Sequence, residues 1–210
     1  MGKQPWRRLS RRGKYTVLVA VLVLIGCVVC VLWRSTPPQG VYLEQAGEVS
    51  VITDILPSEY AGRTEQKRHI RYLVIHETGN TKVGADAAAH NSYLHSEEQK
   101  TIPLSWHYTV DDRMIYHHLP DDEVAYHAGE RNGNLYGIGI EICVNKDGDY
   151  QQALANGAML CACLLDAYDL DLEDIKQHYD FSGKNCPENL RKNEHWQTFL
   201  QMVQTAQQSL

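Results

Sequence analysis

The most continuous apolar stretch of the sequence lies near the amino terminus, at residues 16–33. It reads TVLVAVLVLIGCVVCVLW and carries no charge, and its length is close to the roughly 20 residues that a helix needs to cross a bilayer. Every charged residue in the preceding segment, 1–15, is basic, and positive charge beside a first span holds that flank in the cytoplasm. The pattern predicts a single membrane anchor, with a cytoplasmic segment at 1–15 and the rest of the chain on the outer side.

Two other interpretations of this stretch stay open. A secretory signal peptide has a shorter apolar run and a cleavage site of small residues, and the sequence shows no clean site of that kind. A lipoprotein signal is the second, because LIGC at residues 24–27 resembles a lipid-attachment box around Cys27. The apolar run, however, continues to Trp33, where a processed lipoprotein usually becomes polar. Length and flanking charge therefore favour the uncleaved anchor.

After a polar linker at residues 34–48, the pattern becomes that of one folded domain at 49–210. Short β-branched runs bounded by turn residues predict strands, and apolar positions three or four apart predict helices. Residues 41–68 show neither pattern and are expected to be irregular. The predicted elements are strands at 70–75 and 138–144, a hairpin of 106–110 with 114–118, and helices at 84–99, 154–168 and from about 191. Alternating strands and helices predict an α/β domain with a mixed central β-sheet flanked by helices.

Charge is distributed unevenly along the chain. Seven of the 20 basic residues and none of the 26 acidic residues precede Ser35, so the predicted outer domain is strongly acidic. Nucleic-acid binding depends on neutralising phosphates with basic side chains. The charge pattern therefore argues against a nucleic-acid partner.

Four of the six cysteines follow the predicted anchor. Cys161 and Cys163 are two positions apart on a predicted helix, so their side chains point in different directions and are poorly placed to pair with each other. A disulfide from Cys143 to this helix stays open, but buried free thiols are favoured. Cys186 has a different context, because it shares a loop with a histidine and a lysine.

Three side chains of the types that bind zinc lie next to predicted elements. His76 directly follows the strand predicted at 70–75, and His178 and Cys186 share the loop QHYDFSGKNCP between two predicted helices. A catalytic zinc ion needs three protein ligands and one open position for water, which two imidazoles and one thiolate satisfy. The neighbouring cation Lys184 is expected to favour the thiolate form of Cys186.

One carboxylate and one cation complete this candidate site. Glu141 lies within the apolar strand sequence IGIEICV, where an unpaired carboxylate is costly. If its side chain faces a cleft, burial raises its pKa toward the range of a general base. Lys184, two residues before Cys186, is placed to meet the negative charge that develops on a substrate oxygen during attack by water.

Five segments containing these residues follow one another in a fixed order: LVIHETGN, SWHYTVDD, YHAG, IGIEIC and HYDFSGKNCP. Together they resemble the zinc-dependent N-acetylmuramoyl-L-alanine amidases of the type-2 class, which share their fold with phage lysin amidases and peptidoglycan recognition proteins. The resemblance covers residues 49–210. It implies the fold of that class and hydrolysis of the amide bond between N-acetylmuramic acid and L-alanine of the stem peptide in peptidoglycan.

The resemblance also implies roles for individual residues. The ligands of a single Zn²⁺ ion correspond to His76, His178 and Cys186. The strand glutamate that acts as the base corresponds to Glu141, and the lysine that precedes the cysteine corresponds to Lys184.

The remaining candidates have weaker assignments. Some relatives carry a catalytic tyrosine before the hairpin histidine; that position is Trp106 here, which is given no catalytic role but could form a stacking surface for substrate. His107 is expected to orient a neighbouring group or to be structural. His127 is expected either to touch substrate or to steady the surroundings of the metal. The other residues considered, expected to be on the surface, on a helix face or solvated, are His90, His95, His117, His118, His195 and Glu77.

These expectations combine into a peptidoglycan amidase tethered to a bacterial cell membrane by one span, with its catalytic domain outside the cytoplasm. The alternative from another functional class is a peptidoglycan-binding or sensing module that keeps the fold without turnover. In the recognition-protein branch, loss of the cysteine ligand accompanies that fate. Cys186 therefore favours the enzyme.

Overall fold

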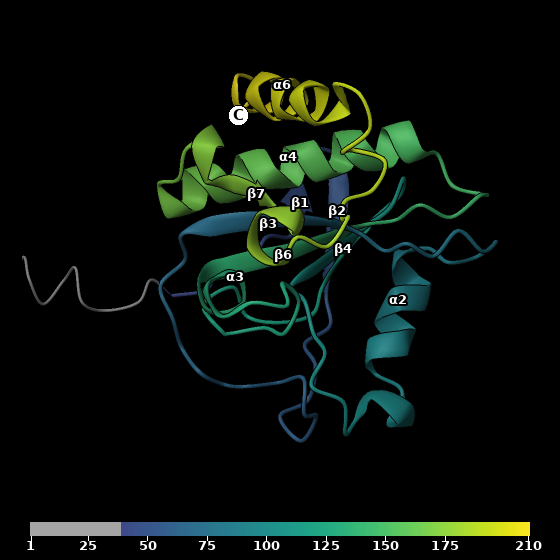
Figure 1. The fold of residues 1–210 in the computed structure, drawn as a ribbon, viewed down its shortest axis with the longest axis vertical. Coiled ribbons are helices and arrows are strands. Elements are labelled where there is room, and N and C mark those ends of the chain that lie inside the picture. Colours follow the sequence, from purple (N-terminus) through teal and green to yellow (C-terminus); the bar gives the residue numbers. More distant parts are fainter. Residues whose placement is uncertain (1–38) are drawn as a thin grey trace, which may run out of the picture. The chain divides into compact units, whose positions relative to one another are not determined.

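A seven-stranded mixed sheet forms the centre of the computed structural model, which describes residues 39–210 (Figure 1). The strand order is β1-β2-β5-β4-β6-β3-β7. β4, β6, β3 and β7 run parallel to one another, whereas β1 with β2 and β4 with β5 form antiparallel pairs. The strands are β1 (Gln45–Ala46), β2 (Val49–Thr53), β3 (Tyr72–Glu77), β4 (Tyr108–Val110), β5 (Ile115–His117), β6 (Gly137–Ile142) and β7 (Ile175–Gln177).

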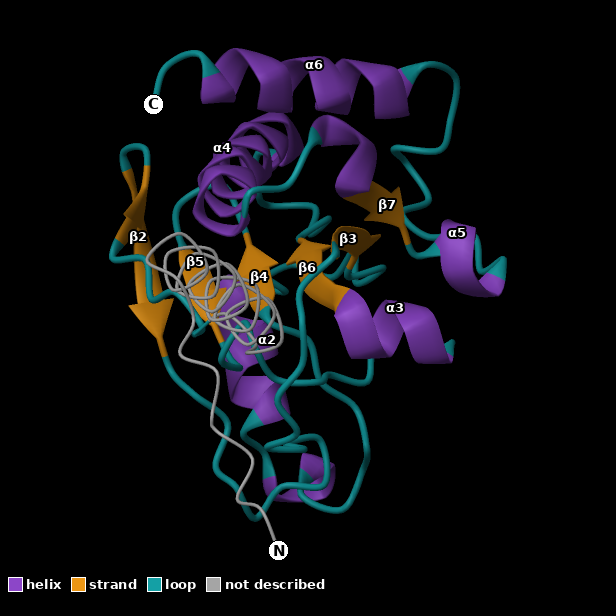
Figure 2. Cartoon of the chain, turned by 90° about the vertical axis from the view of Figure 1, so that its left-hand side faces the viewer, coloured by secondary structure: helices purple, strands orange, loops and turns teal. Residues whose placement is uncertain are grey.

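Helices cover both faces of this sheet (Figure 2). α4 packs on one face and α6 lies on α4 as an outer layer, while α2 lies on the opposite face. The α-helices are α2 (Ala87–Leu94), α3 (Arg131–Tyr136), α4 (Tyr150–Tyr168), α5 (Tyr179–Ser182) and α6 (His195–Gln207), and two short 3-10 helices are η1 (Glu97–Gln99) and η2 (Leu172–Asp174). The predicted mixed sheet flanked by helices is confirmed.

The main core lies between the sheet and α4. The side chain of Asp149 accepts hydrogen bonds from the first turn of α4, which satisfies donors that the start of a helix leaves free. Leu160 and Leu164 of this helix belong to the same buried cluster as Ile75 of β3 and Ile140 of β6. Each such side chain stabilises the fold by about 1.5–3 kcal/mol when fully buried. This packing holds β3 and β6 in fixed register, and these two strands carry the candidate site.

Several predicted boundaries differ from the structure, including the strand predicted at 138–144, which is Gly137–Ile142, and the helix predicted at 154–168, which begins at Tyr150. The strand predicted at 70–75 is Tyr72–Glu77, so His76 lies within the strand and does not follow it. The helix predicted at 84–99 ends at Leu94 because the polar residues after it offer no further apolar position for the core. The last helix begins four residues late, at His195, because Asn193 adopts a left-handed φ of 52°, which an α-helix does not tolerate.

The hairpin prediction is confirmed, since β4 and β5 pair antiparallel. The expectation that residues 41–68 are irregular is wrong in part, because they supply β1 and β2, and β2 extends the sheet beside β5. β7 was not predicted. Its three residues are too few to show an alternating pattern, and its place in the sheet comes from parallel pairing with β3.

The anchor predicted at residues 16–33 lies outside the described residues. Across residues 39–210, no helix is both long and apolar enough to span a membrane.

The cysteines of the described part are free thiols, as the sequence favoured. Cys143, Cys161 and Cys186 are buried, and Cys163 is partly buried. The alternative of a disulfide from Cys143 to the helix that carries Cys161 and Cys163 is therefore wrong.

Candidate metal centre and active site

Three neighbouring parallel strands bring the candidate residues to one end of the sheet. His76 on β3 pairs directly with Glu141 on β6, so both side chains project from the same face of the sheet. His178 follows β7, and its backbone N–H donates to the carbonyl of Ile75 over 3.2 Å. The topology thus places residues from three distant segments side by side.

His76, His178 and Cys186 converge in space. One ligand atom from each lies within 4.8 Å of the other two, and the Cys186 sulfur is 3.8 Å from Nδ1 of His76. All three residues are buried. Neither ring nitrogen of His178 has a well-formed hydrogen-bond partner in the described part of the chain. Buried polar groups in proteins are normally paired, so this unpaired imidazole next to a thiol and a second imidazole fits a metal ligand.

His127 fixes the orientation and protonation of His76. The Nε2 atom of His127 is 3.2 Å from the carbonyl oxygen of Gly137, which can only accept, so this nitrogen carries the proton. Nδ1 of His127 then accepts the hydrogen bond from Nε2 of His76, 2.9 Å away. This tautomer leaves the lone pair on Nδ1 of His76 pointing toward Cys186, the arrangement that a metal ligand requires.

Burial controls the charge of the three candidate ligands. It lowers the pKa of His76 well below 6.5, with the nearby rings of His127 and His178 adding to the effect. Burial and then Lys184 lower the pKa of His178 to about 4. Both imidazoles are therefore neutral at pH 7 and able to bind a metal. Burial raises the pKa of the Cys186 thiol to about 12. Lys184 lowers this pKa, as expected from the sequence, but its effect is smaller than that of burial.

Glu141 has the character expected of a general base. Its side chain is 17 % exposed, and Oε1 lies 3.8 Å from Nδ1 of His76. Its Oε2 atom has no hydrogen-bond partner among the described residues. Burial raises the pKa of Glu141 to about 7, against the opposing charge of Lys184. The predicted direction of this shift is confirmed, and a base with a pKa near the working pH is efficient.

Open space surrounds the cluster on several sides. A pocket of about 370 Å³ is lined by Glu141 and Trp106, and another of about 480 Å³ is lined by His178 and Lys184; Leu104 borders both. A third, of about 450 Å³, is lined by Lys184 and Cys186. The exposed Lys184 therefore borders the space beside two of the three candidate ligands. Substrate has room to lie across the site.

Trp106 lines one of these pockets, and His107 is buried next to His127. The Trp106 indole N–H donates to the Thr109 hydroxyl over 2.7 Å, so the ring is a fixed wall of the pocket that contains Glu141. His107 is fully buried, and its Nδ1 accepts from the backbone N–H of Gly139 over 3.0 Å. Its ring stands edge-on to His127 at 6.0 Å. His107 thus has the structural position predicted for it, one layer behind His127.

Several residues expected at the surface are buried. Glu77 is only 8 % exposed, and its carboxylate accepts hydrogen bonds from the Tyr150 hydroxyl and the Asn189 backbone. His90 lies on the buried face of α2, and His117 and His118 are fully enclosed. The spacing of His90 between Ala87 and Leu94 carried a signal that was not used. Nothing local in the sequence indicates the neighbours of Glu77, which come from distant segments.

Comparison with known proteins decides the family. The family model described as N-acetylmuramoyl-L-alanine amidase matches residues 66–189. The chain belongs to this family. The match spans all five motifs, and members of the family depend on a metal. The family predicted from those motifs is therefore confirmed.

Individual relatives agree with this assignment. The chain is 42% identical over 153 residues to the N-acetylmuramoyl-L-alanine amidase XlyA of Bacillus subtilis (strain 168), covering 72% of this chain and 50% of XlyA. It is 37% identical over 161 residues to CwlH of the same strain, covering 75% of this chain and 62% of CwlH. The chain thus spans between half and two thirds of the length of these curated relatives.

Solved structures show the same fold. The catalytic domain of XlyA superposes with a TM-score of 0.70 and 40% identity, covering 74% of this chain and 99% of that domain. PlyL superposes with a TM-score of 0.65 and 27% identity, covering 74% of this chain and 96% of that structure. The amidase domain of this chain therefore corresponds to nearly the whole of a relative's catalytic domain.

Proposed function

We propose that this chain is a zinc-dependent amidase that hydrolyses the bond between N-acetylmuramic acid and L-alanine in peptidoglycan. One observation carries the proposal: His76, His178 and Cys186 converge at the carboxyl ends of parallel strands, with Glu141 beside them and open pockets around them. Two imidazoles and one thiolate form a donor set that suits zinc and leaves a coordination position free for chemistry. The names of the relatives XlyA and CwlH support the choice of substrate.

A zinc ion held by these three side chains would polarise a water molecule and the substrate carbonyl. Glu141 then acts on the proton of the attacking water, because its carboxylate is partly buried and its pKa is about 7. The same carboxyl group, once protonated, is placed to return the proton to the leaving amine of L-alanine. One residue thus serves as base and then as acid.

Lys184 stabilises the negative charge that forms on the carbonyl oxygen during attack. Its side chain borders the pockets beside His178 and Cys186, and its charge acts on the pKa of His178, Glu141 and Cys186. A fixed positive charge near a developing oxyanion lowers the barrier to amide hydrolysis. Lys184 needs no proton transfer for this role.

His127 and Trp106 support catalysis indirectly. His127 holds His76 in the tautomer that leaves Nδ1 free, and it also lines the pocket that contains His178 and Lys184. Trp106 offers its ring as a wall for the glycopeptide in the pocket that contains Glu141. The two pockets that share Leu104 give room for the substrate on both sides of the scissile amide.

The membrane anchor is also part of this proposal. The uncharged run at residues 16–33 and its basic flank support a single span that leaves the amidase domain outside the cytoplasm of a bacterium. A tethered amidase would act on the wall of its own cell. Fractionation of cells that express the full-length chain tests this: recovery in the membrane fraction, resistant to high salt, is expected. Recovery as a shortened soluble form in the medium would contradict the anchor.

A turnover assay on purified peptidoglycan tests the enzymatic part. The full-length chain is expected to release free L-alanyl amino termini, and a zinc chelator is expected to stop the release. The Glu141→Gln variant should retain zinc but lose about 10²–10⁴-fold in rate. Turnover that is indifferent to chelation and to Glu141→Gln would contradict the mechanism. Tight binding of peptidoglycan without any release would favour the sensing module instead.

A further inference from the structure

Glu77 links the strand that carries one candidate ligand to the loop that carries another. It is the last residue of β3 and directly follows His76. Because neighbouring residues of a strand point to opposite faces, the side chain of Glu77 lies on the α4 side of the sheet while His76 faces the metal site. The side chain of Glu77 has no part in the mechanism described above.

Both carboxylate oxygens of Glu77 are used. Oε2 accepts a hydrogen bond of 2.8 Å from the backbone N–H of Asn189, three residues after Cys186. Oε1 accepts a hydrogen bond from the hydroxyl of Tyr150, the first residue of α4. The residue is 8 % exposed, so water offers little replacement for either bond. The backbone carbonyl of Glu77 also lies 3.9 Å from the Cys186 sulfur.

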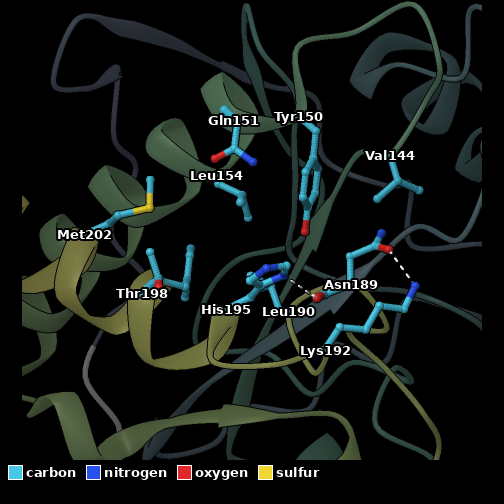
Figure 3. A pocket seen from close by; sticks show the side chains of 11 residues that line it. Val144, Tyr150, Gln151, Leu154, Asn189, Leu190, Lys192, His195, Thr198 and Met202 are labelled. Atoms are coloured by element: carbon cyan, nitrogen blue, oxygen red, sulfur yellow. Dashed lines mark hydrogen bonds between the residues drawn. The ribbon is translucent and has the colours of Figure 1, made fainter.

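Asn189 is one of the points at which this loop is secured. Its carbonyl oxygen lies 3.1 Å from Nδ1 of His195, and its side-chain oxygen accepts from Lys192 over 3.0 Å (Figure 3). Those two contacts are local, within six residues along the chain. The bond from its N–H to Glu77 joins the loop to the sheet, 112 residues away in sequence.

Packing on the outer side of this junction is open. Tyr150 and Asn189 line a cavity of about 520 Å³ between α4, α6 and the loop that precedes α6. The Tyr150 hydroxyl points toward Asn189 across one end of that cavity (Figure 3). The next residue, Leu190, is buried in the main core, so the loop is held by that packed side chain and, beside the open pocket, by the hydrogen bond from Asn189 to Glu77.

We propose that Glu77 is a positioning residue that fixes the Cys186 loop relative to His76 and so sets the geometry of the metal site. The inference rests on the metal site of the proposed function. Two adjacent residues of β3 then have complementary roles. His76 is a metal ligand, and Glu77 is the clamp that holds the loop of the second ligand, Cys186. Loss of the carboxylate frees Asn189, lets the loop move away from β3 and weakens metal binding without removing any ligand.

Zinc affinity of the full-length chain, measured by competition with a chelating dye, tests the clamp. Glu77→Ala should bind zinc about 10- to 100-fold more weakly, the usual loss when a partner that orients a metal ligand is removed. Glu77→Gln should stay close to the unaltered chain, because its amide oxygen can accept from Asn189 and its amide nitrogen can donate to Tyr150. Tyr150→Phe, which removes one of the two bonds, should fall between them.

Glu123→Ala is the matched control. Glu123 is also a buried carboxylate, but it pairs with Arg63 at 2.6 Å and contacts none of the three candidate ligands. The control is expected to unfold at lower temperature and to keep its zinc affinity. Equal affinities for Glu77→Ala and the unaltered chain would overturn the inference, as would an equal loss in Glu123→Ala. If Glu77→Ala does not fold, an unchanged affinity in Tyr150→Phe would overturn it.

Amide hydrogen exchange of the metal-free chains separates this inference from the proposed function. Glu77→Ala should raise exchange at residues 185–190 by about tenfold or more through local opening, while Glu123→Ala should leave that segment unchanged. Zinc binding does not enter this readout. An unaltered chain that binds no zinc would refute the proposed function, whereas unchanged exchange at residues 185–190 would refute the clamp alone.

Discussion

Two groups of buried histidines lie on the same side of the sheet, and their hydrogen bonding differs. At the carboxyl ends of β3 and β7, neither nitrogen of His178 has a well-formed hydrogen-bond partner within residues 39–210. Beside β4, both nitrogens of His118 are engaged: Nε2 lies 2.9 Å from the Thr109 hydroxyl and Nδ1 lies 3.2 Å from the side-chain oxygen of Asn91. Burial is nearly the same in the two places.

The difference indicates what separates a candidate metal ligand from a structural histidine. The network around His118 continues through Thr109 to the indole of Trp106, so its polar groups stabilise one another and one wall of a pocket. The imidazoles of the metal centre instead present free nitrogens to a thiol and to a carboxylate with a raised pKa. Unused donors and acceptors next to open space, and not burial alone, identify the reactive site.

The largest expected effect comes from removing the sulfur ligand. Cys186→Ser should lose stoichiometric zinc and reduce turnover of peptidoglycan to background, because a serine hydroxyl is a poor zinc ligand at neutral pH. Metal analysis of the purified full-length variant beside the unaltered chain measures the first effect directly. Cys143→Ser is the control, since Cys143 is a buried thiol outside the ligand cluster. Full zinc content in Cys186→Ser would contradict the contrast between the two histidine groups.

Removing the cation at the mouth of the site should have the next largest effect. Lys184→Met should lower kcat by about 10²-fold or more while zinc content stays the same, because stabilisation of the oxyanion is lost. Lys67→Met provides a control at a second exposed lysine, whose nitrogen pairs with Asp122 at 2.8 Å. An equal loss in both variants would mean that general positive charge, and not the position of Lys184, supports turnover.

The comparison between the two histidine groups can be tested directly with matched substitutions. His127→Ala removes the partner that orients His76 and should weaken zinc binding by about 10- to 100-fold. His118→Ala should leave zinc affinity unchanged and lower the free energy of unfolding by about 1–3 kcal/mol, because it leaves the buried groups of Thr109 and Asn91 unpaired. Zinc competition and urea unfolding on both variants measure the two quantities. Reversed results would refute the distinction.

The pH dependence of turnover tests the general base without any change to the chain. Burial raises the pKa of Glu141 to about 7, and a general base must be ionised to accept a proton. The value of kcat/KM should therefore rise as pH increases from about 5 to 7, by about tenfold per unit well below the pKa, and should level off above it. The Glu141→Gln variant should lose this dependence. A flat profile for the unaltered chain over that range would remove Glu141 from the role of base.

Sequence alone predicted which three side chains converge at the candidate metal site, because they lie in motifs with fixed order and recognisable chemistry. It also predicted that Glu141 lies in a strand and has a raised pKa, since a carboxylate within the apolar sequence IGIEICV is expected to be buried. Residues defined by distant neighbours were missed. From the sequence, Glu77 is expected to be solvated, because it follows a candidate ligand at the end of a strand. Its burial depends on hydrogen bonds from Tyr150 of α4 and Asn189 of the loop after α5.

The strand β7 and the burial of His118 were not predicted, for a related reason. β7 has three residues and owes its place to pairing with β3, and no local pattern marks so short a strand. His118 looked like a surface residue because its partners Thr109 and Asn91 come from β4 and α2. Local periodicity predicts the long elements of this domain, whereas tertiary contacts determine which polar side chains are buried.

The X-ray absorption spectrum of zinc bound to the full-length chain tests the central claim most directly. We expect one zinc ion per chain, with one sulfur at about 2.3 Å and two imidazole nitrogens at about 2.0–2.1 Å in its coordination shell. A spectrum without sulfur in that shell, or a chain that takes up no zinc, would contradict the assignment of His76, His178 and Cys186 as the ligands.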